Sequence, residues 1–168
     1  MYGEWLRVSE AELEKARIDL RWARELAMEI SEAEAELTDP AMRRNFGTDK
    51  TWHALDFLLR RRGFPISIIL GEELFVEDLD DPQADWGYGA PCYLTSEQVR
   101  QAASELAGLA EADLIEGVDQ SELEAAEIYP TVWDRPGELE WAVCHLPYVK
   151  AYFDAAASKG DAIICWIG

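Results

Sequence analysis

Apolar side chains recur at spacings of three and four residues in several stretches of the chain, as in helices that bury one face. Two of these stretches begin with a capping box, in which a Ser or Thr caps the helix start and a Glu or Gln reaches back. The pairs are Ser9 with Glu12 and Thr95 with Gln98. The patterns predict helices over about residues 10–36, 49–62 and 96–107, two short acidic helices after 108, and a helical segment over 139–159 with a break near Pro147.

Shorter runs have the alternating or β-branched composition of strands. Residues 1–8 alternate, FPISIILG (64–71) is β-branched, and CYL (92–94) leads into a capped helix. AIICWI (162–167) is apolar on both faces, so we expect it at the centre of a sheet. AMRRNFG (41–47) is expected as a loop or a short turn of helix. The sequence therefore predicts a single α+β domain over residues 1–168, with a small mixed sheet and about four to six helices packed around it.

The formal net charge of −19 is concentrated in the middle third of the chain. Residues 71–127 contain 16 acids and one base, Arg100, which gives −15, whereas 1–70 and 128–168 each sum to −2. Such a field repels nucleic-acid phosphates and anionic membranes, and it speeds association with a basic partner. An acidic surface can also serve solubility alone. We therefore expect no nucleic-acid or membrane partner, and retain a basic protein partner and plain solvation as two explanations.

Targeting signals and cysteines bear on the cellular compartment. The N-terminal residues lack a basic region followed by an apolar one, and no apolar run approaches the roughly 18 residues of a membrane span. Cys92, Cys144 and Cys165 are an odd number without close spacing, which argues against a disulfide framework and a zinc knuckle. The sequence predicts a cytoplasmic protein with reduced thiols.

The stretch KTWHALDFLL (50–59) contains the first candidate functional residues. At about 100° per residue, Trp52 and three leucines share an apolar arc, while His53, Asp56 and Arg60 fall on a neighbouring polar stripe. One interpretation is a half-exposed histidine in a local row of ion pairs. The other is a functional pair in which Asp56 fixes the tautomer of His53. A metal site is not favoured, because His145 is the only other histidine.

Two loops rich in aromatic residues supply further candidates for binding. In WGYG (86–89), the glycines permit a tight turn that brings Trp86 and Tyr88 against another part of the protein. IYPTVWDRPG (128–137) contains Tyr129, Trp133 and two prolines, so we expect an ordered loop there. The candidate binding residues are therefore Trp52, His53, Asp56, Trp86, Tyr88, Tyr129 and Trp133.

The acidic segment before WGYG matches neither a metal loop nor a phosphate loop. Its carboxylates are those of a calcium site in composition, but Pro82 stands where a ligand is needed. WGYGAP lacks the lysine and the glycine spacing of a phosphate loop. We therefore expect a solvated loop, and no metal or cofactor. The aspartates concerned are Asp78, Asp80, Asp81 and Asp85.

Support for catalysis is limited. The sequence has no Gly-x-Ser-x-Gly elbow, and Cys144 is the only cysteine with a neighbouring base, His145. Adjacent residues on a helix point about 100° apart, so we expect Cys144 to be a small core residue rather than a nucleophile. No catalytic residue is assigned, and a binding protein is favoured over an enzyme.

The chain resembles the YfbM-like family of uncharacterised bacterial proteins over essentially its whole length. The motifs that carry the resemblance are TWHALDFLL, DWGYGAPCYLTSEQV, IYP and LPYVKAYFDAAASKGDAII, in that order. It implies a single α+β domain and adds no chemistry, because the function of the family is unknown. In the family pattern the position of Asp56 is often histidine, so a pair of histidines one turn apart is absent here. Some relatives look associated with toxin systems, which implies an immunity-like role.

Two functions remain as hypotheses. In the first, the acidic face of residues 71–127 docks a basic partner, such as a nuclease-like toxin, with the aromatic loops as anchors. In the second, a small-molecule site or an active site forms where Trp52 and His53 meet the WGYG and IYP loops. The first is favoured, and the oligomeric state is not predicted.

Overall fold

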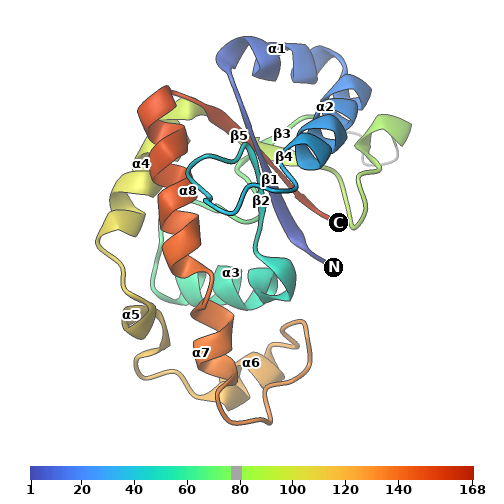
Figure 1. The fold of residues 1–168 in the computed structure, drawn as a ribbon. Coiled ribbons are helices and arrows are strands. Elements are labelled where there is room, and N and C mark those ends of the chain that lie inside the picture. The colour runs from blue at the N-terminus through green and yellow to red at the C-terminus, as the bar shows by residue number, and fades with distance from the viewer. Residues whose placement is uncertain (77–80) are drawn as a thin grey trace.

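The computed structural model describes residues 1–76 and 81–168 and confirms the α+β class (Figure 1). Its strands form one sheet in the order β2-β1-β5-β4-β3, so β5 lies at the centre, as its two apolar faces predict. All pairings are antiparallel where a mixed sheet was predicted. The strands are β1 (Gly3–Val8), β2 (Asn45–Gly47), β3 (Glu73–Leu74), β4 (Cys92–Leu94) and β5 (Ala162–Ile167).

Both capped helices begin where the sequence predicts, and the predicted break near Pro147 is present, whereas the helix predicted over residues 10–36 is divided. Both capping boxes are present. Asp19 interrupts the first helix and caps the second part with its own side chain, while Pro147, which lacks an N–H, stands in the first turn of a new helix. The α-helices are α1 (Glu10–Ile18), α2 (Leu20–Ala33), α3 (Trp52–Arg61), α4 (Ser96–Ala107), α5 (Glu111–Ile115), α6 (Gln120–Ala125), α7 (Glu138–Val143) and α8 (Leu146–Lys159).

The sheet separates two apolar clusters. In Figure 1, α1 and α2 lie on one side of the strands, and α3, α4 and α8 lie on the other. Side chains alternate along β1, so that Trp5 joins the larger cluster while Leu6 and Val8 join the cluster under α1 and α2. Residues that follow one another on β1 therefore face different environments, which matters for Glu4 and Arg7 below.

Two predicted elements differ in the structure. FPISIIL does not form a strand: Ile68 and Ile69 are buried in a turn, and the Ile68 carbonyl accepts a hydrogen bond of 2.7 Å from the Trp5 indole. The Trp5 side chain satisfies this buried carbonyl, so the β-branched residues can be buried without the backbone hydrogen bonds of a sheet. AMRRNFG, expected as a loop, ends in strand β2, which pairs with β1 from Glu4 to Leu6.

The guanidinium of Arg7 joins several parts of the chain inside the protein. Arg7 is 1% exposed, and its Nε donates to an oxygen of Asp161 at 3.0 Å. The remaining guanidinium nitrogens donate to the carbonyls of Ala41, Arg43 and Ala155 at 3.1–3.3 Å. One side chain thus links β1 to the segment before β2, to α8 and to the start of β5.

All three cysteines are free thiols, in different surroundings. Cys165 is buried, and it is the cross-strand neighbour of the half-buried Cys92. Cys144 is exposed, so the prediction that it is a core residue is wrong, because the chain leaves α7 at this position and turns the side chain outward. Burial raises the pKa of all three thiols. None of the helices in the described ranges combines the length and the apolar character that a membrane span requires.

Candidate functional site

The loop between α6 and α7 is held in shape by one of the predicted aromatic residues. Trp133 is 4% exposed, and its indole Nε1 donates to the Ile128 carbonyl at 2.7 Å. Its ring lies 6.2 Å from that of Trp141 on α7. The indole therefore closes the loop over residues 128–133 and fixes the surface around it.

A cavity of about 240 Å³ opens between the end of α6 and this loop. Three of its residues are exposed acids, and none of the three forms an ion pair with a described Lys or Arg. The loop cavity therefore presents uncompensated carboxylates beside an aromatic ring. Its lining is Glu124, Glu127, Ile128, Thr131, Trp133 and Asp134.

Glu127 has an unusual backbone conformation at the edge of this cavity. Its φ is 53°, in the left-handed region that glycine or asparagine normally occupies at the end of a helix. An L residue in this conformation costs about 1–2 kcal/mol. A glutamate at this position therefore adds a carboxylate to the cavity at some expense of stability.

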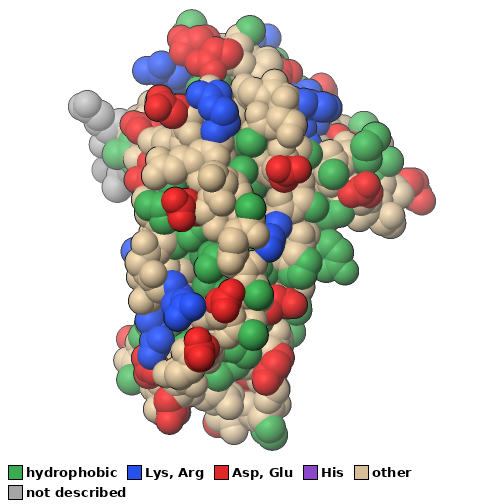
Figure 2. All heavy atoms as spheres, turned by 90° about the vertical axis from the view of Figure 1, so that its left-hand side faces the viewer, with side chains coloured by type: hydrophobic (Ala, Val, Ile, Leu, Met, Phe, Trp, Pro, Cys, Tyr) green, Lys and Arg blue, Asp and Glu red, His purple; other side chains and the backbone are tan. Residues whose placement is uncertain are grey.

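At least one face of the protein carries no single acidic patch. Figure 2 shows a face on which Asp and Glu side chains are spread between Lys and Arg. Several carboxylates of the described residues also form ion pairs with arginines of the same chain, as in Glu12–Arg44, Asp56–Arg60 and Glu122–Arg61. Net charge alone therefore does not mark a docking site, whereas the loop cavity gathers three unpaired acids in one lining.

The structure brings Trp52, His53 and Tyr129 together. The Trp52 ring stacks on His53 with centroids 4.7 Å apart and lies 6.5 Å from the ring of Tyr129. The backbone N–H of Tyr129 donates to Nδ1 of His53 at 3.0 Å. An accepting Nδ1 means that the neutral ring carries its proton on Nε2. The contact ties α3 to the IYP loop, far apart in sequence.

The pair His53–Asp56 is not joined directly. Asp56 forms an ion pair with Arg60 at 2.9 Å, and the tautomer of His53 is set by the Tyr129 amide instead. Burial lowers the pKa of His53, more than the nearby Asp56 carboxylate raises it. Burial also raises the pKa of Asp56, which Arg60 partly opposes. This environment keeps the imidazole neutral and supports a structural contact between α3 and the loop.

Replacing His53 with alanine is expected to lower the free energy of unfolding by about 1–3 kcal/mol, because the Tyr129 N–H loses its acceptor and Trp52 loses a stacked ring. Asparagine is the matched variant, since its side-chain oxygen can stand near the position of Nδ1. Urea unfolding followed by circular dichroism measures both. Equal losses for His53→Ala and His53→Asn would show that the hydrogen bond contributes little.

The WGYG loop lies at the end of the central strand. Its backbone meets the end of β5, where the N–H of Tyr88 donates to the Ile167 carbonyl at 2.8 Å. A Cβ at Gly87 would lie 2.7 Å from the same carbonyl, and its φ is 135°, so this position needs glycine. Trp86 is buried in the cluster under α1 and α2, whereas Tyr88 is 67% exposed. The structure thus places Trp86 on the opposite side of the sheet from Trp52.

The acids of the loop cavity were not singled out from the sequence. Glu124 and Glu127 belong to the acidic third, and Asp134 follows it, but nothing in the pattern says which acids meet around Trp133. Among the described residues, no group of three His, Cys, Asp or Glu side chains is placed to hold a metal ion. Asp78 and Asp80 lie outside the described residues.

The fold and the loop cavity define a small α+β protein with a candidate docking surface. The chain belongs to the family that shares a domain of unknown function (DUF1877), whose model matches residues 1–166. This confirms the resemblance to the YfbM-like family. A solved structure of YfbM from Escherichia coli, a protein of unknown function, is 17% identical, with 98% of each chain covered and a TM-score of 0.61. That similarity shows the fold alone. No curated protein matches the chain.

Proposed function

We propose that the protein is a binding protein that docks a basic protein partner by receiving a lysine or arginine side chain in the loop cavity. The observation that carries the proposal is the set of three unpaired carboxylates, those of Glu124, Glu127 and Asp134, around the fixed indole of Trp133. Carboxylates form charge-assisted hydrogen bonds with a cation, and a tryptophan ring attracts one through its π face.

The charge distribution favours the same class of partner. The excess of −15 in residues 71–127 speeds the encounter with a basic protein and adds affinity at low salt. In an immunity-like role, which the sequence resemblance implies, this partner is a nuclease-like toxin. In this proposal the protein acts in the cytoplasm, in keeping with its free thiols.

The alternative, a small-molecule or active site around Trp52 and His53, has less support. Trp52 is only 9% exposed, and Nδ1 of His53 is already occupied by the Tyr129 amide. Trp86 of the WGYG loop, which this alternative requires, lies in the cluster under α1 and α2, on the opposite side of the sheet from Trp52.

Affinity capture from a lysate of the native organism tests the proposal with three forms of the protein. The cavity variant carries Glu124→Gln, Glu127→Gln and Asp134→Asn. The control carries Glu25→Gln, Glu29→Gln and Glu32→Gln, three exposed acids of α2, and has the same net charge. We expect the wild type and the control to capture a basic protein that the cavity variant does not capture. Salt should release this protein from both. Equal capture by both variants would contradict the role of the cavity.

Glycine at position 127 separates stability from binding. Because φ at this position is positive, Glu127→Gly is expected to raise the free energy of unfolding by about 0.5–1 kcal/mol, after allowance for the greater freedom of the unfolded chain. The same change removes one carboxylate from the cavity and should weaken capture of the partner. Urea unfolding and capture are measured on the same variant. A loss of stability would mean that the Glu127 side chain makes contacts that offset its backbone strain.

A further inference from the structure

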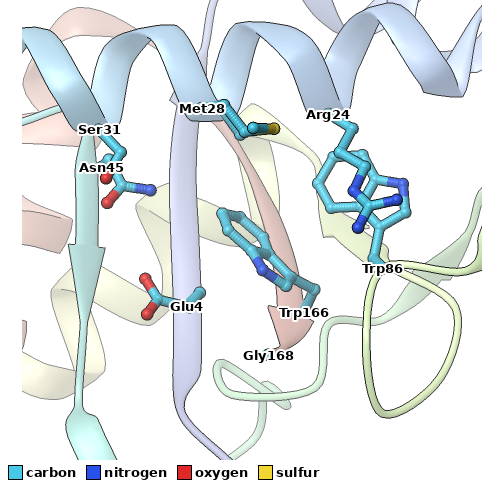
Figure 3. A pocket seen from close by; sticks show the side chains of 9 residues that line it. Glu4, Arg24, Met28, Ser31, Asn45, Trp86, Trp166 and Gly168 are labelled. Atoms are coloured by element: carbon cyan, nitrogen blue, oxygen red, sulfur yellow. The ribbon is translucent and has the colours of Figure 1, made fainter.

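A second cavity, of about 290 Å³, lies between α2 and the sheet (Figure 3). Strands β1, β2 and β5 form its floor through Glu4, Asn45 and Trp166. Its roof is one face of α2, because the lining residues recur at spacings of three and four. These are Arg24, Ala27, Met28 and Ser31. Trp86 and Gly168 complete the lining, so this sheet cavity is separate from the loop cavity.

Glu4 places a carboxyl group at one end of the sheet cavity. Its cross-strand neighbours are Gly47 on β2 and Trp166 on β5. A Cβ added at Gly47 would lie 3.0 Å from Oε2 of Glu4, so the missing side chain leaves room for this carboxyl. Glu4 forms no ion pair with a described Lys or Arg, although Arg43 and Asp49 are near enough to act on its charge in opposite directions. The carboxyl is thus free to bind a cation.

The other end of the cavity is basic, and its middle is apolar. Figure 3 shows Arg24 and Glu4 at opposite ends, with Met28 and Trp166 between them. Arg24 is exposed and forms no ion pair with a described acid. Trp166 packs edge-on against Trp86 with centroids 5.3 Å apart, and Met28 is 60% exposed. An exposed methionine at the mouth of an aromatic-walled cavity is a surface that a ligand can cover.

We propose that this cavity binds a small zwitterion in which an apolar chain joins a primary amine, placed beside Glu4, to a carboxylate, placed beside Arg24. The carboxyl of Glu4 accepts hydrogen bonds from the ammonium group, and the guanidinium of Arg24 donates to the carboxylate. The chain between them lies against Trp166 and Met28.

The length of the cavity sets the separation of the two charges. Arg24 and Ser31 line opposite ends of the α2 face, seven residues of helix or about 10 Å apart, and Figure 3 shows Glu4 below the Ser31 end. A cavity of about 290 Å³ lies just below the range for small-molecule sites, roughly 300–1,000 Å³, so only a small ligand fits. An ω-amino acid of about six to eight carbons fits both limits, whereas an α-amino acid holds its charges too close together.

Isothermal titration calorimetry with five probes tests the proposal. The zwitterions are 4-aminobutanoate, 6-aminohexanoate and 8-aminooctanoate, and hexylamine and hexanoate each lack one charged group. We expect one of the two longer zwitterions to bind best, and hexylamine and hexanoate each to bind roughly tenfold more weakly than 6-aminohexanoate, because each loses one charge-assisted contact.

Variants assign each charged group to its partner in the cavity. Glu4→Gln should remove the advantage of 6-aminohexanoate over hexanoate, and Arg24→Gln should remove its advantage over hexylamine. Glu29→Gln and Arg21→Gln change exposed residues of α2 that do not line the cavity, and should leave both advantages intact. Met28→Trp fills the mouth and should block all five probes.

Three results would overturn the inference. Hexanoate binding as tightly as the zwitterions would exclude recognition of the amine at Glu4. Binding that survives Met28→Trp would place the ligand elsewhere. Absence of binding by every probe at millimolar concentration would exclude this ligand class. None of these results bears on the loop cavity, so the proposed function stands or falls separately.

Discussion

Replacing Arg7 with methionine is expected to lower the free energy of unfolding by about 3–5 kcal/mol, the range for loss of one partner of a buried ion pair. The guanidinium is 1% exposed and donates to Asp161 and to three backbone carbonyls. Methionine fills much of the space but donates to none of these acceptors. Asp161, whose side chain is 18% exposed, then keeps a poorly hydrated charge without a partner.

Two further variants show whether this loss comes from the buried network. Arg17→Met is the matched control, because Arg17 and its partner Glu14 are 52% and 59% exposed, and an exposed pair contributes about 0–1 kcal/mol. Arg7→Lys keeps the charge without the planar set of donors, so its stability should fall between those of the wild type and Arg7→Met. Urea unfolding at neutral pH measures all of them. A loss for Arg7→Met no larger than that for Arg17→Met would contradict the structural role of the network.

Replacing Glu4 with glutamine is expected to stabilise the protein at pH 8 and to have little effect at pH 5. Burial raises the pKa of Glu4 from 4.5 to about 7; Arg43 opposes the rise and Asp49 adds to it. Between these two values the folded protein retains a proton that the unfolded chain has lost, so stability falls as pH rises from about 4.5 to 7. The full effect above pH 7 is about 3.5 kcal/mol, from about 1.4 kcal/mol for each pKa unit.

The pH-dependent difference between Glu4→Gln and the wild type isolates this carboxyl. The lowered pKa values of His53 and His145 give the wild type an opposite trend, with stability lost as pH falls below their ordinary value, but they are common to both proteins. Urea unfolding at pH 5 and pH 8 measures the difference. If Glu4→Gln changes stability by the same amount at both pH values, Glu4 does not titrate in the folded protein near pH 7.

Local signals in the sequence predicted the elements that depend on local chemistry. The boxes Ser9–Glu12 and Thr95–Gln98 cap helices because their partners lie three residues apart. The final strand could be placed at the centre of the sheet because every residue is apolar. The strand prediction for FPISIIL was wrong, although its composition fits a strand. The segment forms a turn, in which the Ile68 carbonyl accepts a hydrogen bond from the Trp5 indole.

The candidate sites were harder to predict, because they depend on where loops meet. The amide of Tyr129 reaches His53 across 76 residues of sequence, and no periodicity announces such a contact. The residues of the sheet cavity left one signal. Glu4 shares a face of β1 with the apolar Leu6 and Val8. A charged residue on such a face either has a partner in the interior or lies at the edge of a cavity. Arg7 beside Trp5 on the other face is the same kind of signal.

The loop cavity can be tested without knowing the partner, by observing the tryptophan indoles in ¹H–¹⁵N NMR spectra during titration with a short peptide that carries one arginine between neutral residues. The proposed function predicts that the Trp133 signal shifts more than those of Trp22 and Trp166, which do not line the cavity. The shift should vanish in the Glu124→Gln, Glu127→Gln, Asp134→Asn variant and persist in the α2 control of equal charge. Small and equal shifts of all indoles, or a Trp133 signal that does not move, would contradict docking at this site.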